Sequence, residues 1–302
     1  FNNLSIEFEP NQLHVVMGAS GCGKSTLIKT LCGVHQPDHG KILRDGKEVS
    51  LTSPFSARNE GIATVFQEFS VVPTLSVAEN IFLGVLPKKN GFIDWTKMYS
   101  DAKKVLAKIN VRIDPEAIVG NLSVGDQQLV EISKAIAQNA SLIILDEPTD
   151  GLDPNQKHQV RELIRNLAKD KIVIVSTHIL EEVSAVCSRA MILAEGKVLF
   201  DGTPTALAAQ SDFHNAVTVR VSRTTEALLS ALEALSVVKK VVAGDSDSMT
   251  IFPTDGQPIL AEVNRVIQEQ ACQVEELHVE VGRLDDVFRK LTLTPTELEA
   301  SL

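Results

Sequence analysis

The sequence has no apolar run of the length that a bilayer-spanning helix needs. Such a helix takes about 18 to 20 consecutive apolar residues, whereas apolar stretches such as 142–145 and 172–175 have only the length of a strand. We therefore expect no direct membrane span. Any role at a membrane is expected to run through a partner protein.

Cysteines are few and widely separated. Cys22, Cys32, Cys187 and Cys272 form no C-x-x-C pair, and no secretory signal precedes them. This spacing argues against a disulfide framework and against a zinc site. A reducing, cytoplasmic environment fits best.

Basic residues are in the minority. The chain has 29 lysines and arginines against 39 aspartates and glutamates, a net charge of −10. Because binding to a nucleic-acid backbone requires clustered positive charge, we expect no nucleic-acid partner. Aromatic residues make up only 4% of the 302 residues, but 44% are hydrophobic and 23% charged, which is typical of one large or two modest globular domains.

Strand-like and helix-like segments alternate from residue 4 to about residue 207. This alternation predicts an α/β domain, at 1–210, with a largely parallel sheet. Between 76 and about 135 apolar residues recur at helical spacing, which predicts a helical insert. The expected strands are 5–8, 13–17, 62–66, 142–145 and 172–176, followed by a hairpin of 190–193 and 197–201. The first of them starts close to Phe1, so we expect the N-terminus to be truncated.

A second pattern begins after a small, polar linker at 208–215. It predicts an accessory domain at 216–292 with the strand and helix order βαββαβ, which is the order of a ferredoxin-like unit. The expected strands are 217–221, 237–243, 249–252 and 273–281, and the expected helices are 226–235, 258–270 and 283–291.

A glycine-rich stretch follows the expected strand 13–17 and precedes the helical run 27–31. It fits the phosphate-binding pattern GxxxxGK[ST] in full, in the strand–loop–helix context that the pattern requires. Its backbone N–H groups can converge on phosphate oxygens, Lys24 supplies positive charge, and the Ser25 hydroxyl can ligate Mg²⁺. By itself it predicts only a nucleoside triphosphate and Mg²⁺. Its residues are Gly18, Ser20, Gly21, Cys22, Gly23, Lys24, Ser25 and Thr26.

Two acidic residues come directly after the apolar strand 142–145. Asp146 is placed to hold Mg²⁺, and Glu147 is the candidate to polarise the water that attacks the terminal phosphate. Two adjacent acids after a strand are equally typical of a solvated turn, but the phosphate loop favours the catalytic interpretation.

The stretch 122–128 reads LSVGDQQ and opens a helix at Ser123, a residue favoured at helix N-caps. With it the chain resembles the ATP-binding-cassette (ABC) ATPases, whose signature LSGGQ lies between the phosphate loop and the acidic strand. The resemblance covers about 210 residues. It implies a P-loop NTPase fold of the ABC type, with ATP and Mg²⁺ as cofactors.

The resemblance also implies roles for residues outside these motifs. Gln67 would touch Mg²⁺ and relay to a membrane partner, Asp153 would lie in a loop between two paired cassettes, and His178 would contact the terminal phosphate. Two cassettes of this family pair head to tail, so Ser123 and Gly125 of one would bind ATP held by the other. The implied partners are a second ABC ATPase subunit and a membrane-spanning permease.

The chain departs from the family pattern at Asp126, where the signature usually has Gln. The added negative charge leaves open a weakly hydrolysing, regulatory nucleotide-binding module. The aromatic residue on which the family stacks adenine could not be identified.

Different stretches resemble different transporter classes. Those at 33–37, 61–84 (with 75–80 inside it) and 91–95 are similar to bacterial sugar importers. The part from 147–154 through 176–183, and the tail ending at 284–288, are similar to drug or polysaccharide exporters. We expect an ATP-hydrolysing subunit at the cytoplasmic face of the membrane, powering export through a separate permease. A sugar-importer subunit is the alternative.

Overall fold

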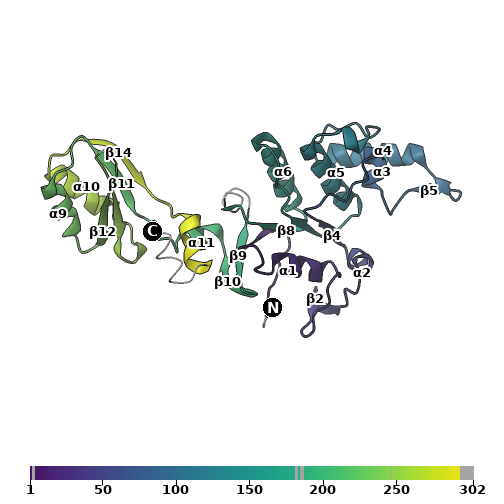
Figure 1. Cartoon of the computed structure of the whole chain (residues 1–302), viewed down its shortest axis with the longest axis horizontal. Coiled ribbons are helices and arrows are strands. Elements are labelled where there is room, and N and C mark those ends of the chain that lie inside the picture. The colour runs from purple at the N-terminus through teal and green to yellow at the C-terminus, as the bar shows by residue number, and fades with distance from the viewer. Residues whose placement is uncertain (2–3, 181–182, 184–186, 246, 293–302) are drawn as a thin grey trace. The chain divides into compact units, whose positions relative to one another are not determined.

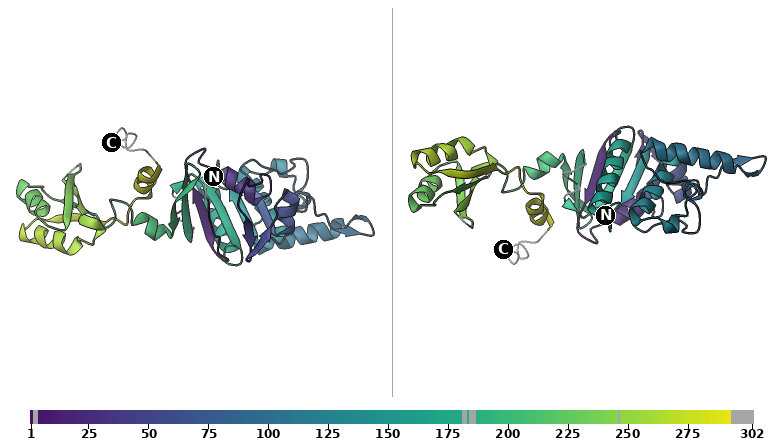
Figure 2. Two further views of the ribbon diagram at one scale, coloured as in Figure 1. Left: turned by 90° about the horizontal axis from the view of Figure 1, so that it is seen from below. Right: turned by 90° about the horizontal axis from the view of Figure 1, so that it is seen from above.

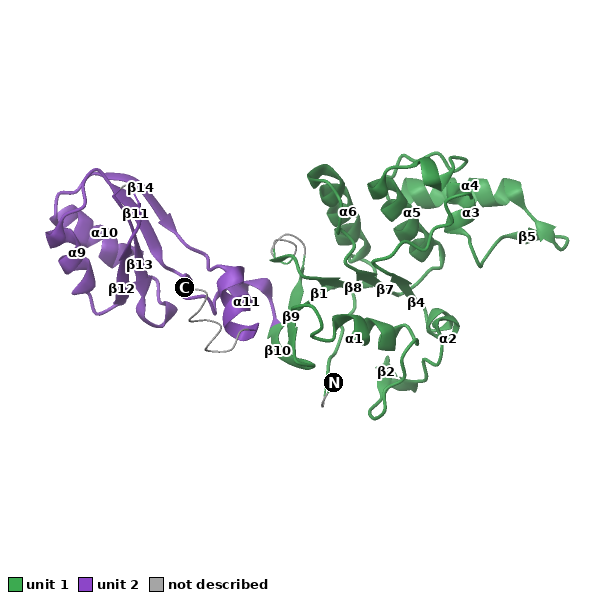
Figure 3. Ribbon diagram, viewed as in Figure 1, with its two compact units in different colours: residues 1–201 green, residues 202–302 purple. Residues whose placement is uncertain are grey.

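The computed structural model describes residues 1, 4–180, 183, 187–245 and 247–292. Two residues of the exporter-like stretch, 181 and 182, lie outside this part. The chain divides into two compact units, 1–201 and 202–302 (Figure 3). This division precedes the predicted linker because helix α8 (Pro204–Ala208) packs against α11 (Leu284–Thr292) in the second unit. No helix among the described residues is long and apolar enough to cross a membrane.

A six-stranded sheet forms the centre of the first unit, in the order β10-β9-β1-β8-β7-β4. Strand β1 pairs in parallel with β8 and β9, and β7 pairs in parallel with β8 and β4. Helix α1 (Lys24–Leu31) lies on one side of the sheet, and α5 (Val124–Ala137) and α6 (Pro154–Leu167) lie on the other (Figure 1). The strands are β1 (Leu13–Met17), β4 (Ile62–Val65), β7 (Leu142–Asp146), β8 (Ile172–Thr177), β9 (Arg189–Ala194) and β10 (Lys197–Gly202).

The central strands read as continuous apolar runs because helices cover both faces of the sheet. All five residues of β1 are buried, as are Ile143, Ile144 and Leu145 in β7. The predicted strands of this sheet, and the hairpin that turns at Glu195 and Gly196, are confirmed to within a residue or two.

The predicted strand 5–8 is wrong. Leu4, Ile6 and Phe8 pack against the core while Ser5 and Glu7 are exposed, which produces the alternation seen in the sequence. The segment nevertheless pairs with no strand of the described chain. Alternating burial alone does not make a strand, because a strand also needs a hydrogen-bonded neighbour.

The helical insert contains α3 (Val77–Ile81), α4 (Trp95–Lys108) and α5, which share an apolar cluster around Ile81, Met98 and Leu106. The insert is not entirely helical. A short hairpin of β5 (Lys88–Lys89) and β6 (Phe92–Ile93) interrupts it. Strands of two residues are too short to show alternation in the sequence.

A second hairpin, also not predicted, follows α1 in the sequence and precedes β4. Strands β2 (Ile42–Arg44) and β3 (Lys47–Val49) turn at Asp45 and Gly46, which both have positive φ angles. Helix α2 (Pro54–Asn59) follows, and Ser53 caps its N-terminus.

The second unit has a four-stranded antiparallel sheet in the order β12-β13-β11-β14. Buried residues of β11 and β13 pack with residues of α9 and α10 in one apolar cluster. The elements follow one another as expected, but assignment to the ferredoxin-like fold stays a prediction. They are β11 (Val217–Val221), α9 (Glu226–Glu233), β12 (Val238–Ala243), β13 (Ser248–Pro253), α10 (Leu260–Glu269) and β14 (Val274–Val279).

The two units are expected to unfold separately. Leu232→Ala truncates a fully buried side chain in the second unit and should lower that unit's free energy of unfolding by about 2–5 kcal/mol. Hydrogen exchange of the whole chain should show faster exchange in β11 and β13 and unchanged protection in β1 and β8.

Leu260→Ala, at a position that is 40% exposed, provides the matched control and should change protection little. Faster exchange in both units of Leu232→Ala would show that they unfold as one.

Candidate functional site

Five neighbouring strands of the central sheet are parallel, so their carboxyl ends lie at one edge. Residues that the sequence singled out lie at four of these ends. Gly18 follows β1, His178 follows β8, Asp146 ends β7 and is followed by Glu147, and Gln67 lies two residues after β4. The edge outside the carboxyl ends of parallel strands is the usual ligand position in such sheets.

The loop after β1 depends on its glycines. Gly21 and Gly23 have φ angles of 80° and 113°, a region that other residues rarely adopt. A Cβ at Gly18 would lie 2.3 Å from Cys22 Sγ and 2.4 Å from the carbonyl oxygen of Leu193, so a side chain has no room there. The loop leads directly into α1, which has no side-chain N-cap. The first N–H groups of α1 are therefore available to an anion.

The side chain of Lys24 lies within this loop. It is 9% exposed, and Nζ donates hydrogen bonds to the carbonyl oxygens of Gly18, at 2.7 Å, and Ala19, at 3.3 Å. The hydroxyl-bearing residues of this stretch, Ser20, Ser25 and Thr26, are exposed. The loop therefore has exposed hydroxyl groups near the Lys24 ammonium group, which hydrogen bonds hold in place.

The two acids after β7 are bound to the neighbouring strand β8. Ser176 Oγ donates a hydrogen bond to Asp146 Oδ1. The N–H of Glu147 donates to the carbonyl oxygen of Ser176, at 3.1 Å. Glu147 has a φ angle of 49°, an uncommon backbone conformation for a residue other than Gly, Asn or Asp. Strained backbone of this kind is concentrated at functional sites.

His178 and Glu147 are in direct contact, although 31 residues separate them in sequence. His178 Nδ1 lies 2.9 Å from Glu147 Oε2. The Glu147 side chain is 10% exposed and that of His178 is 56% exposed. A largely buried carboxylate beside an accessible imidazole can hold and orient a water molecule.

Gln67 contacts a different aspartate from the one singled out in the sequence. Gln67 Nε2 donates to Asp150 Oδ2 at 3.2 Å. Asp153 instead caps helix α6, because Asp153 Oδ1 accepts from the N–H groups of Asn155 and Gln156, both at 2.9 Å. The loop 150–153 therefore has one aspartate facing Gln67 and one occupied by the helix.

Ser123 is the N-cap of α5, as predicted. Its hydroxyl donates to Asp126 Oδ2 at 2.7 Å and accepts from the N–H of Asp126 at 3.2 Å. A Cβ at Gly125 would lie 2.6 Å from Cδ of Gln156 on α6. The contacts of Ser123 and Gly125 thus run to helices and not to the loop that holds Lys24.

Ser176 is the site residue that the sequence did not reveal. It is fully buried and contacts both acids, yet a serine at the end of an apolar strand gives no signal of its own. Only the pairing of Asp146 with Ser176 across β7 and β8 places them together.

Comparison with known families identifies the family to which the first unit belongs. Residues 1–150 match the family model described as ABC transporter. The chain carries an ABC-transporter ATPase domain.

Curated relatives of this ABC ATPase domain have names that refer to sugar import. The ribose import ATP-binding protein of Rubrobacter xylanophilus is 40% identical over 199 residues, which are 66% of this chain and 40% of the relative. The arabinose import ATP-binding protein of Vibrio parahaemolyticus is 39% identical over 196 residues, which are 65% of this chain and 39% of the relative. The chain thus spans about two-fifths of the length of these relatives.

Solved ABC cassettes share the fold. CbiO1 from Clostridium perfringens, described as part of the ABC transporter complex cbiONQ, has a TM-score of 0.59 and 25% identity, and covers 68% of this chain and 83% of that chain. The ATP-binding cassette MJ0796, a dimer bound to ADP and Pi, has a TM-score of 0.57 and 25% identity, and covers 66% of this chain and 88% of that chain. The predicted ABC-type P-loop fold is confirmed.

Ser176→Ala is expected to weaken Mg²⁺-dependent steps of this ABC ATPase domain. Loss of the hydrogen bond to a carboxylate costs about 1.5–3 kcal/mol and leaves Asp146 without its partner on β8. The Mg²⁺ concentration for half-maximal ATP turnover should rise by about tenfold or more, while binding of ATP in EDTA should not change.

The matched control is Ser141→Ala, which removes an exposed serine that bonds to Arg44 and Gly61 before β7 begins. Equal effects of both substitutions on the Mg²⁺ dependence would contradict a positioning role for Ser176.

Proposed function

We propose that the chain binds ATP with Mg²⁺ at the edge formed by β1, β8, β7 and β4 and hydrolyses it to drive transport. The observation that carries this proposal is the contact between His178 and Glu147 at the strand ends that flank the phosphate loop. It provides a carboxylate and an imidazole where the terminal phosphate of a nucleotide in the loop would lie.

The loop residues would hold the phosphates. The N–H groups from Gly18 to Thr26 donate to phosphate oxygens, and Lys24 neutralises their charge. Glu147 polarises the attacking water, and His178 keeps the Glu147 carboxylate in place by donating from Nδ1, with its ring beside the terminal phosphate.

The residues near the loop also fit Mg²⁺. Among the described residues no group of three or more His, Cys, Asp or Glu side chains could hold a metal. Mg²⁺ does not need such a group, because it usually takes one or two protein oxygens together with phosphate oxygens and water. Ser25, Asp146 and Gln67 supply oxygen atoms of this kind. When bound, the ion neutralises charge on the outer phosphates.

A complete site requires a second ABC ATPase subunit. Ser123 is exposed at the N-terminus of α5, and its hydrogen bonds do not reach the phosphate loop. A helix N-terminus is attractive to phosphate, so we propose that Ser123 and Gly125 bind the ATP held by the partner subunit. Asp153, at the start of α6, would lie near the same contact between subunits.

The relatives support sugar import better than the export that we first expected. Both relatives described above are import ATP-binding proteins, for ribose and arabinose. The exporter-like stretches in the sequence favour export instead. Neither of the two relatives, however, has a name that refers to export. We propose a subunit of a sugar importer.

A cavity in the first unit suits a permease contact. It has a volume of about 200 Å³, and its lining includes Ala57, Phe66, Ser70 and Glu131. The backbone N–H and Oγ of Ser70 donate to the buried Glu131 carboxylate, at 2.6 and 3.1 Å, which fixes the segment after Gln67 to α5.

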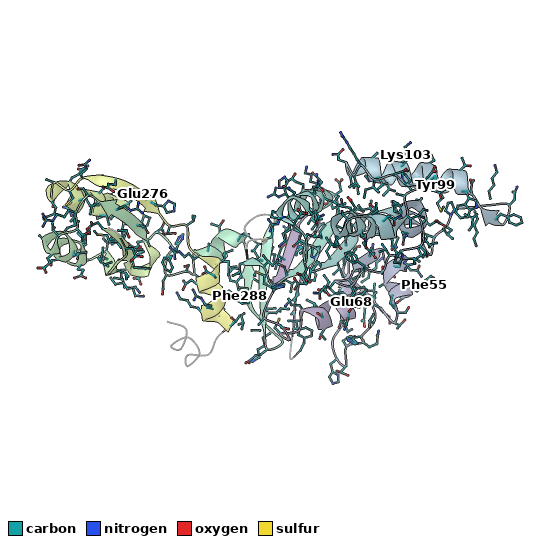
Figure 4. The ribbon with its side chains drawn as sticks, turned by 45° about the horizontal axis from the view of Figure 1, so that its top comes forward. Phe55, Glu68, Tyr99, Lys103, Glu276 and Phe288 are labelled. Atoms are coloured by element: carbon teal, nitrogen blue, oxygen red, sulfur yellow. The ribbon has the colours of Figure 1, made fainter. Side chains whose placement is uncertain are left out.

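Exposed aromatic side chains lie close in sequence to this lining. Phe55, on α2, is 68% exposed, and Phe69 is 41% exposed. Figure 4 shows Phe55 and Glu68 among the surface side chains of this unit. We propose that a permease segment docks here, which would place the chain at the cytoplasmic face of the membrane.

Glu147→Gln is expected to abolish ATP turnover, by at least a hundredfold, and to preserve ATP binding. The amide keeps the size of the side chain and removes the charge that polarises water. Because ATP then persists, light scattering should detect a dimer that forms with Mg²⁺ and ATP and dissociates with ADP. The unchanged chain should show turnover per molecule that rises with protein concentration.

Glu162→Gln is the control, since this glutamate lies on the exposed side of α6 and pairs with Arg165. Nucleotide binding without turnover or dimerisation in any variant would instead support the weakly hydrolysing regulatory module.

The direction of transport can be measured in vesicles. The permease that co-purifies with the chain from the membranes of its own cells is first reconstituted into them together with the chain. We expect labelled ribose or arabinose to move toward the side that holds ATP and this chain. Movement of substrate away from that side would establish export.

A further inference from the structure

The β5–β6 hairpin and helix α4 form an arm on the helical insert. The turn at Asn90 and Gly91 has φ angles of 55° and 87°, and β5 and β6 pair only with each other. Figures 1 and 2 show the hairpin extending past the N-terminal end of α4. We call residues 88–108 the insert arm.

One side of the insert arm is firmly attached to the first unit. Met98, Ala102 and Leu106 follow one face of α4 and are at most 2% exposed in the core of the insert. At the base of the hairpin, the N–H of Asp94 donates to the carbonyl oxygen of Pro87 at 2.9 Å. The arm therefore presents its other side in a fixed orientation.

The N-terminal end of the arm carries exposed aromatic rings. Phe92 is 81% exposed, and Trp95 is 48% exposed. Trp95 stacks on Tyr99 with ring centroids 6.5 Å apart, and Tyr99 packs against the core of the insert. The chain has only one tryptophan and one tyrosine, and both are here. Exposed aromatic groups of this kind mark an interaction surface.

The charge of the insert arm is opposite to that of the chain. Residues 88–108 contain six lysines and two aspartates, a charge of +4, whereas the whole chain carries −10. Lys97 and Lys104 share Asp101, each at 2.8 Å. Within the described chain, Lys88, Lys89 and Lys103 form no ion pair. Lys103 and Tyr99 are labelled on α4 in Figure 4. The arm thus offers unneutralised positive charge to an anionic partner.

We propose that the insert arm rests on the anionic headgroup surface of a lipid bilayer. Tryptophan, tyrosine and phenylalanine rings favour the bilayer interface, and adjacent lysines can reach lipid phosphates. Lysine is depleted from protein–protein interfaces, so its concentration around the aromatic rings favours lipid over a protein partner. This contact goes beyond the proposed function, because it needs neither the permease nor ATP turnover.

The single tryptophan makes the proposal directly testable on the whole chain. Vesicles of phosphatidylcholine with about one-third phosphatidylglycerol should shift the Trp95 emission to shorter wavelength and carry the chain with them in flotation. Vesicles of phosphatidylcholine alone should do so far less, and high salt should reverse the effect.

Two sets of substitutions should weaken binding to these vesicles. Lys88→Ser with Lys89→Ser should lower the partition coefficient about 25-fold, at about fivefold for each lysine. Phe92→Ser should lower it about tenfold. The matched controls are Lys239→Ser with Lys240→Ser, an exposed lysine pair on β12, and Leu43→Ser, an exposed leucine on β2. All variants should retain the ATP turnover of the unchanged chain.

Four outcomes would overturn the proposal. The first is the absence of a Trp95 shift with the anionic vesicles, and the second is an equal loss of binding in the arm and control variants. The third is the same shift with inorganic phosphate alone, which would indicate a free-anion site. The fourth is unchanged vesicle binding by arm variants that no longer bind the permease in detergent, which would make the arm a protein-docking surface.

Discussion

Parallel pairing of four neighbouring strands is the constraint on which the candidate site depends. Because β1, β8, β7 and β4 run in one direction, every residue that follows their carboxyl ends reaches the same edge. Residues as far apart in sequence as Gly18 and His178 lie at the same edge for this reason. Because helices cover both faces of the sheet, its strands are apolar and burial specifies their register. The backbone of the sheet, more than any side-chain contact, therefore sets the positions of Lys24, Asp146 and Glu147.

Much of this arrangement could be predicted from the sequence because its parts are locally encoded. The phosphate loop needs glycines at positions with positive φ, and the central strands need continuous apolar runs, so both leave patterns in the sequence. The N-cap at Ser123 is equally local. The motif order indicated the family, and the strand ends indicated the site.

What could not be predicted depends on pairing or on competition between partners. Residues 5–8 show strand alternation but lack a neighbour, and the two-residue strands of the β5–β6 hairpin are too short to show any. The role of Ser176 can be recognised only from the structure, because the register of β7 with β8 places it opposite Asp146. The sequence analysis singled out Asp153 alone, but Asp153 caps α6, and Asp150 is the aspartate that contacts Gln67.

The hydrogen bonds of Lys24 have a consequence for the entropy of binding an anion. Its ammonium group donates to the carbonyl oxygens of Gly18 and Ala19, which use two of its three N–H donors and leave the third for an anion. The long lysine side chain is therefore ordered by the loop itself. Because this ordering belongs to the fold, little further side-chain entropy has to be lost when the ammonium group binds an anion.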